Sequence, residues 1–100
     1  MHTGTLWRWT SLNGPAAWFF ITIDGAAGDA IAATALMRRL EGMGARGFGS
    51  VKVRAAIGGS RWSSSVFPVK GGGYMLPVKA AIRKAEGLGE GDAVTLVLEF

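Results

Sequence analysis

The stretch "LPVKAAIRKAEGLGEGDAV", residues Leu76 to Val94, contains the signals from which the fold can be argued. Pro77 suits the first turn of a helix, where its missing N–H costs nothing. Gly87 is typical of the left-handed residue that ends a helix, and Leu88 of the apolar contact that accompanies such an ending. Gly91 then turns the chain into a final strand. The helix would bury one apolar stripe, made of Val78, Ala81, Ile82 and Ala85.

The end of this helix recurs earlier in the chain. The segment "LMRRLEGMG" (Leu36 to Gly44) aligns without gaps on "AIRKAEGLG" (Ala81 to Gly89). The elements expected around each copy come in the same order, strand–strand–helix–strand. We therefore expect one domain over residues 1–100, built from two ββαβ halves of about 1–58 and 59–100, with their boundary near Gly58-Gly59. Each half alone leaves open strand edges, so two halves would close into a barrel around a pseudo-twofold axis.

Alternation of apolar and other residues predicts the strands. In residues 51–57, Val51, Val53 and their successors alternate with Lys52 and Arg54, so one face should lie in the core and the other should be basic. The other expected strands cover residues 6–10, with Trp7 and Trp9 on one face, and residues 18–23, 61–67, 74–76 and 94–100.

A first helix is expected near Ala30–Glu41, with Asp29 as its N-cap and Gly42 as its end. Its expected apolar stripe consists of Ala32, Ala35, Leu36, Leu40 and Met43. Turns are expected at "NGP", Asn13 to Pro15, and at Gly58-Gly59. The fold class is thus mainly β with two short helices.

Composition limits the class of protein. The chain has 100 residues, 49% of them hydrophobic and 18% charged, which is enough apolar material for a core. It contains no cysteine, and its N-terminal residues do not resemble a signal peptide. The longest apolar run, Ala16 to Ile21, is too short to cross a bilayer. We expect a cytoplasmic protein that is a monomer and does not enter a membrane.

Charge is distributed unevenly along the sequence. Residues 38–84 hold ten of the eleven Lys and Arg residues and one of the seven Asp and Glu residues, a net charge of +9, whereas the remainder has −5. Such asymmetry is typical of proteins with an anionic partner, although scattered solvated residues produce it as well.

Three segments resemble a bacterial family catalogued as domain of unknown function nineteen hundred and five: "GFGSVKV" (Gly47 to Val53), "IGGSRWSSSVFPVKGGGYMLPVKAAIRKAEGL" (Ile57 to Leu88) and "GD" (Gly91-Asp92). The opening stretch also resembles the half-unit of AbrB/MazE-type barrels. The resemblance implies a single-chain, helix-capped double-split barrel of the AbrB type. Some relatives carry a YdeI/OmpD-associated bacteriocin-protection segment, for which this chain has no room. "IDGAAGD" replaces a proline that usually opens the first helix, which implies a longer or looser junction there.

Catalytic patterns are weak. Ser60, Ser63, Ser64 and Ser65 are possible nucleophiles, but the only histidine, His2, lies near a terminus expected to fray, and no nucleophile elbow is present. "KGGGY" (Lys70 to Tyr74) lacks the spacing of a phosphate-binding loop and fits a hairpin loop better. The resemblance supplies no catalytic residues, and we expect no cofactor and no metal site.

The best candidates for binding an anion or nucleic acid are basic residues and one tryptophan: Lys52, Arg54, Arg61, Trp62, Lys70, Lys79 and Arg83. Trp62 could stack on a base or ring, but a tryptophan beside a strand more often fills the core. No exposed aromatic ladder is evident from the sequence. Three functions remain open: a non-catalytic module for an anionic partner such as nucleic acid or an acidic ligand, a protein-interaction domain, and an enzyme for a small anionic substrate. A flat basic face would favour the first, an apolar patch the second, and a pocket with Arg61 and Lys79 the third.

Overall fold

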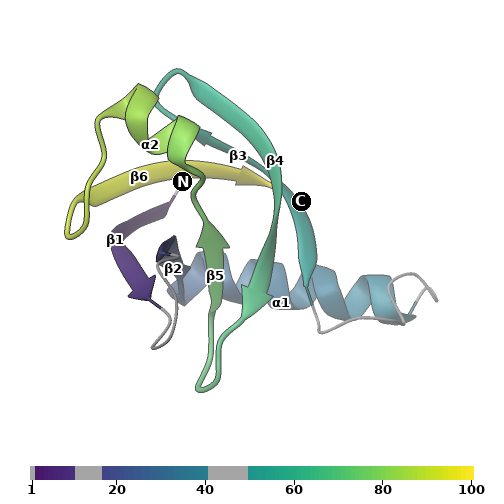
Figure 1. Ribbon diagram of the computed structural model, residues 1–100. Coiled ribbons are helices and arrows are strands. Elements are labelled where there is room, and N and C mark those ends of the chain that lie inside the picture. Colours follow the sequence, from purple (N-terminus) through teal and green to yellow (C-terminus); the bar gives the residue numbers. More distant parts are fainter. Residues whose placement is uncertain (1, 11–16, 41–49) are drawn as a thin grey trace.

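Six strands and two helices make up the described part of the chain (Figure 1). The computed structural model describes residues 2–10, 17–40 and 50–100. In chain order the elements are β1 (His2–Thr10), β2 (Ala17–Ile23), α1 (Gly25–Leu40), β3 (Val51–Ile57), β4 (Ser60–Pro68), β5 (Tyr74–Pro77), α2 (Ala80–Glu86) and β6 (Ala93–Glu99). The predicted order of elements is confirmed.

The strands form a closed barrel in the order β1-β2-β5-β4-β3-β6, with antiparallel neighbours throughout. A mainly-β fold with two helices is therefore confirmed. The largest fully buried side chains are Leu6, Ile21, Ile23, Ile31, Leu76, Leu96 and Val66. Most come from strands, where alternation sends every second side chain into the barrel.

The hairpin of β3 and β4 follows its sequence pattern. Val51, Val53, Ala55 and Ile57 are buried, whereas Lys52 and Arg54 are exposed. The predicted turn is present, because Ile57 pairs with Ser60 and leaves two residues between the strands. Gly58 has a φ of 55°, a conformation that favours glycine in such short hairpin turns.

Pro77 does not open a helix. It ends β5, where it lies opposite Phe20 of β2. The N–H of the next residue, Val78, donates a 2.9 Å hydrogen bond to the Phe19 carbonyl. In an antiparallel ladder this alternation turns the Pro77 nitrogen away from β2, so β2 loses no hydrogen bond. The Pro77 nitrogen instead faces β4. No ladder hydrogen bond is lost on that side either, because β4 pairs with β5 only through Phe67 and Pro68, which do not lie opposite Pro77.

Helix α2 ends as the sequence predicts. Gly87 adopts the left-handed conformation (φ 64°, ψ 38°). The N–H of Leu88 donates to the Arg83 carbonyl at 2.8 Å, and the Gly87 N–H donates to Lys84 at 3.4 Å, which together make a Schellman ending. Of the expected apolar stripe, Val78 and Ile82 are buried, but Ala81 and Ala85 are exposed.

The turn after α2 joins the helix to β1. Gly91, with a φ of 89°, donates to the Leu6 carbonyl at 2.8 Å. The Leu6 N–H in turn donates to the Asp92 carbonyl at 2.9 Å. The predicted Gly-Asp turn is therefore confirmed, and it delivers the chain into β6 beside β1.

Helix α1 differs from the prediction at its start. It begins at Gly25, so only Asp24 separates it from β2, and the expected longer junction is wrong. Asp29 lies inside the helix and is not its N-cap. A Cβ on Gly28 would come within 2.9 Å of the Ile23 carbonyl oxygen. This close approach lets the helix start directly at the end of β2.

The apolar stripe of α1 is also different from the predicted one. Ile31 is fully buried, with Ala27 and Ala35 packed beside it at a spacing of four residues. Ala32, Leu36 and Leu40 are exposed, because only the first half of α1 rests on the barrel and the second half extends past it (Figure 1). The predicted turn at Asn13 to Pro15, the helix end at Gly42 and the stripe residue Met43 lie outside the described residues.

Candidate anion-binding groove

A groove of about 340 Å³ opens where β4 and β5 diverge beyond their short ladder. Three segments form its walls: the start of β2, the middle of β4 and the link from β5 into α2. Its walls consist of Ala17, Trp18 and Phe19, then Trp62, Ser63 and Ser64, and finally Pro77, Val78, Lys79, Ala80 and Arg83. The groove thus gathers three of the predicted site residues, Trp62, Lys79 and Arg83.

Arg83 is held in a fixed orientation in this groove. Its Nε donates a 3.2 Å hydrogen bond to the Val78 carbonyl, and its guanidinium carbon lies 3.8 Å from the centre of the Phe19 ring. The face of the ring attracts the cation, and the flat guanidinium stacks on it. The terminal nitrogens of the guanidinium are the donors that remain for a carboxylate or phosphate.

Lys79 adds a second positive charge to the groove. It immediately precedes α2 in an extended conformation (φ −69°, ψ 158°), and its side chain is exposed. Among the residues that the structure describes, no Asp or Glu lines this groove. An anion entering it would therefore meet two cations and the uncharged Ser63 and Ser64.

Trp62 belongs mainly to the core. Its side chain is 9% exposed and lies in the main cluster of buried residues. The exposed remainder lines the groove on one side and a second hollow on the other. Trp62 is therefore a wall residue, and it does not present a free ring face for stacking.

The second hollow, of about 830 Å³, has mixed charge. It holds Arg54 and Arg61 together with Glu99. In the ladder Arg54 pairs with Ser63 on one side and with Glu99 on the other, so the carboxylate lies on the same face as the guanidinium. This hollow is less suited to an anion than the groove, because Glu99 already offsets part of its positive charge.

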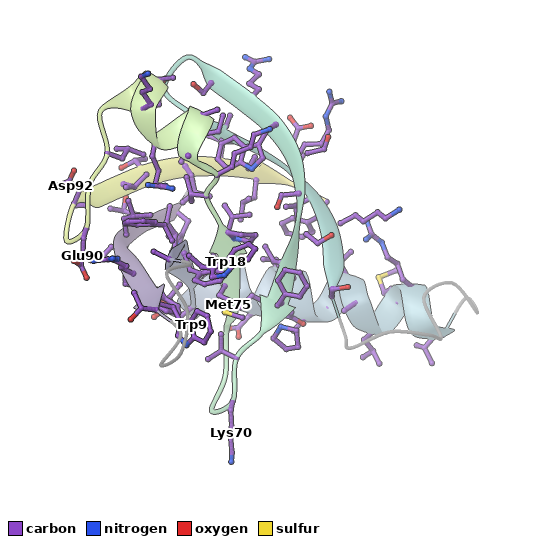
Figure 2. All side chains as sticks on the ribbon, in the orientation of Figure 1. Trp9, Trp18, Lys70, Met75, Glu90 and Asp92 are labelled. Atoms are coloured by element: carbon purple, nitrogen blue, oxygen red, sulfur yellow. The ribbon has the colours of Figure 1, made fainter. Side chains whose placement is uncertain are left out.

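Of the two remaining candidates, Lys52 lines a hollow that shares Ser63 and Ser64 with the groove, and Lys70 lies apart from it. Lys52 is exposed on the outer face of β3 and lines a shallow hollow with Arg38 and Arg54. Lys70 projects from the tip of the β4–β5 hairpin, away from the barrel (Figure 2). Six of the seven candidates therefore line hollows that meet at Ser63, and Lys70 lies apart from them.

An exposed aromatic patch adjoins the groove, and the sequence-based expectation that no aromatic ladder is exposed was wrong. We define the aromatic patch by the residues that surround a hollow of about 260 Å³, which are Trp7, Trp9, Trp18, Phe20 and Met75. In the β1–β2 ladder Trp7 pairs with Phe20 and Trp9 with Trp18. Trp9 is 49% exposed and Trp18 is 54% exposed.

The inner half of the aromatic patch is tightly fixed. The ring centres of Trp7 and Phe20 are 5.0 Å apart, and the indole N–H of Trp7 donates a 3.0 Å hydrogen bond to the hydroxyl of Thr22. Figure 2 shows Trp9, Trp18 and Met75 together on this side of the barrel, with Lys70 beyond them. The patch is a rigid outer surface of the barrel.

The model of a family described as "Domain of unknown function (DUF1905)" matches residues 2–98. The chain belongs to the DUF1905 family. No curated protein and no solved structure matches it. Membership confirms the resemblance seen in the sequence, and it brings no established activity for the groove or the aromatic patch.

Two polar side chains of this DUF1905 domain that were weighed for catalysis are engaged within the fold. The hydroxyl of Ser60 donates a 2.7 Å hydrogen bond to the Glu86 carboxylate. His2 does not lie in a frayed end: it pairs with Leu96 of β6, and its Nε2 lies 2.9 Å from the Thr22 carbonyl oxygen. Within the described ranges, no three His, Asp or Glu residues come together as metal ligands would. In the same ranges, neither α1 nor α2 has the length and apolar character of a bilayer-spanning helix.

Proposed function

We propose that this protein is a non-catalytic binding module for an anionic partner, either a nucleic-acid backbone or an acidic ligand, and that the groove between β4 and α2 is its binding site. One observation supports this most strongly. Arg83 is already stacked on Phe19 and hydrogen-bonded to Val78, so little side-chain entropy is lost when its guanidinium meets an anion.

The charges around the groove support the same proposal. Lys79 reinforces Arg83, and the residues lining the groove include no carboxylate that would compete with a ligand. A net charge of +4 adds a weak long-range attraction for anions. The enzyme alternative is less well supported, because Arg61 and Lys79 line separate hollows.

A titration with linear inorganic polyphosphate tests the proposal, because this ligand offers anionic groups and nothing else. Binding is expected to weaken with added salt and to fall several-fold in Lys79→Ala, since one of two cations is lost. Lys84→Ala is the matched control. It removes the same charge from an exposed position of α2 outside the groove. Equal losses in the two variants would contradict a site in the groove.

A protein-interaction role without nucleic acid is the second candidate, and the aromatic patch favours it. Exposed tryptophans in a group mark contact surfaces for other macromolecules. Selection of displayed peptides against the protein tests this role. If the protein-interaction role is correct, the selected peptides should be apolar and should no longer bind the Trp18→Ala variant. If the anion-binding role is correct, they should be acidic and should no longer bind the Lys79→Ala variant.

We also propose that the barrel is of the double-split, AbrB-like type, with its two ββαβ halves related by a pseudo-twofold axis. Exchanging β1, β2 and β3 with β4, β5 and β6 returns the same set of neighbouring strands around the barrel. The two helices differ in length, and we expect the same approximate rotation to relate them. Superposition of the halves in an experimental structure tests this. Cytoplasmic location and a monomeric state stay predictions.

A further inference from the structure

We propose that the anionic partner is single-stranded nucleic acid, with its bases stacked on Trp9 and Trp18 and its phosphates bound by Lys79 and Arg83. The inference rests on the proposed function, and it extends the binding site from the groove onto the aromatic patch. It adds a class of ligand and a role for two tryptophans that anion binding alone does not require.

The groove and the aromatic patch are continuous through Trp18. This residue lines both hollows. The β2–β5 ladder pairs Phe20 with Pro77, and Val78 continues that alignment by donating to the Phe19 carbonyl. Trp18 and Lys79 both line the groove, and both side chains are exposed, so the groove carries an accessible indole and an accessible ammonium group.

The combination matches the chemistry of a single strand. Each nucleotide presents a phosphate and a flat base, and proteins bind such strands with cationic grooves beside aromatic rings on which bases stack. Trp9 and Trp18 are paired across two strands and each has about half of its surface exposed, so ring area is available to bases. Trp7 and Phe20 form the pair two positions along the ladder, on the same face of the sheet, and pack against each other there.

A duplex fits this surface less well. Its bases are stacked on one another, and stacking on protein rings requires bases that are free to leave that stack. An acidic peptide would use Lys79 and Arg83 but would gain little from the flat faces of two tryptophans. The acidic residues Glu90 and Asp92 lie by the start of β6, at a distance from the labelled tryptophans in Figure 2, so they do not oppose a strand at the patch.

The test compares two ligands of the same charge. One is a fluorescein-labelled oligothymidylate of about 12 nucleotides, and the other is an abasic oligomer of equal length with the same phosphates. Anisotropy titrations at about 50 mM salt, where backbone contacts are still strong, measure both. We expect the oligothymidylate to bind at least about fivefold more tightly, and binding to quench tryptophan fluorescence.

Substitutions then separate stacking from charge. Trp18→Ala should remove most of the advantage of the oligothymidylate and leave the abasic oligomer almost unchanged. Lys79→Ala should lower the affinity for both oligomers by the same factor. Val97→Ala is the control for loss of an exposed apolar side chain, since Val97 lies on β6 and outside the aromatic patch. Circular dichroism confirms that each variant is folded.

The outcomes distinguish this inference from the proposed function. If both oligomers bind equally and Trp18→Ala changes neither, base stacking is wrong and anion binding stands. If neither oligomer nor polyphosphate binds, both proposals fail. Tighter binding of the matching duplex, or of polyglutamate, would overturn a single-stranded ligand in favour of a duplex or an acidic protein. If sedimentation shows that the protein self-associates and that this association displaces the oligomer, the aromatic patch is an interface for a second copy of the chain.

Discussion

Ser60, directly after the β3–β4 turn, donates a 2.7 Å hydrogen bond to a carboxylate oxygen of Glu86, the last residue of α2. The bond joins two residues 26 positions apart and fastens the end of the helix to the barrel wall. Gly58 permits this approach, because a Cβ at that position would collide with the Glu86 carboxylate.

Removing this bond should lower stability in a non-additive way. Ser60→Ala and Glu86→Ala are each expected to reduce the free energy of unfolding by about 1 kcal/mol, and the double variant by little more than either, because both remove the same bond. Urea denaturation followed by circular dichroism measures all three. Additive losses would show that the two side chains are not coupled.

Two glycines offer a matched test of backbone conformation. Gly87→Ala should destabilise the protein by roughly 1 kcal/mol, because an alanine must hold the left-handed conformation at the end of α2. Gly59→Ala makes the same chemical change at a position without a positive φ and with open space around a Cβ. A comparable loss in melting temperature for both variants would contradict the role of Gly87.

The geometry of Arg83 predicts that charge alone does not suffice in the groove. Arg83→Lys keeps the charge but loses the flat stacking on Phe19 and the Nε hydrogen bond to Val78. Affinity for polyphosphate is expected to fall several-fold. Lys79→Arg serves as the converse change at the exposed cation and should leave affinity nearly constant. If both conservative variants bind as the unaltered protein does, the orientation of Arg83 has no role.

Salt dependence identifies which surface holds a strand. Each phosphate contact to single-stranded nucleic acid contributes about 0.7 to the slope of log affinity against log salt. Lys79→Ala should therefore reduce the slope by about 0.7, and Lys52→Ala with Arg54→Ala should leave it constant. A reduction of about 1.4 in that double variant would place the contacts on the outer face of β3 instead.

Sequence patterns predicted the elements whose conformation is decided locally. The strict alternation from Val51 to Ile57 fixes the inner face of β3, and Gly87 followed by Leu88 fixes the end of α2. Both signals arise from neighbouring residues and from backbone preference. The internal repeat predicted that two halves close into a barrel, and that closure is confirmed, but the order of the strands around it was not predicted.

The wrong predictions concern features that depend on distant residues. Pro77 satisfies the rule for a helix start and the rule for a strand edge equally well, and its pairing with Phe20 decides between them. The predicted stripe of α1 shares Ala35 with the observed one but includes Ala32 and Leu36 in place of Ile31, because the sequence does not reveal how far the helix overlaps the barrel.

The candidate site was predicted only in part. The clustering of basic residues in the sequence predicted Lys79 and Arg83 as site residues. It could not predict that Arg83 stacks on the ring of Phe19, which belongs to β2 and lies 64 positions away in the sequence. Trp9 and Trp18 were missed as an exposed pair. The aromatic residues of "WRW" and "WFF" on the two sides of "NGP" were the available signal, since antiparallel pairing of the two strands aligns them.

The closure of the barrel also determines when it can form during synthesis. β1 pairs with β6, and the hydroxyls of Thr3 and Thr95 meet at 3.0 Å across 92 positions. At about 5–20 residues per second, the ribosome completes β1 several seconds before it completes β6. Throughout that interval one edge of β1 has no partner strand, so the nascent chain carries an open edge that only the last strand of the barrel can cover.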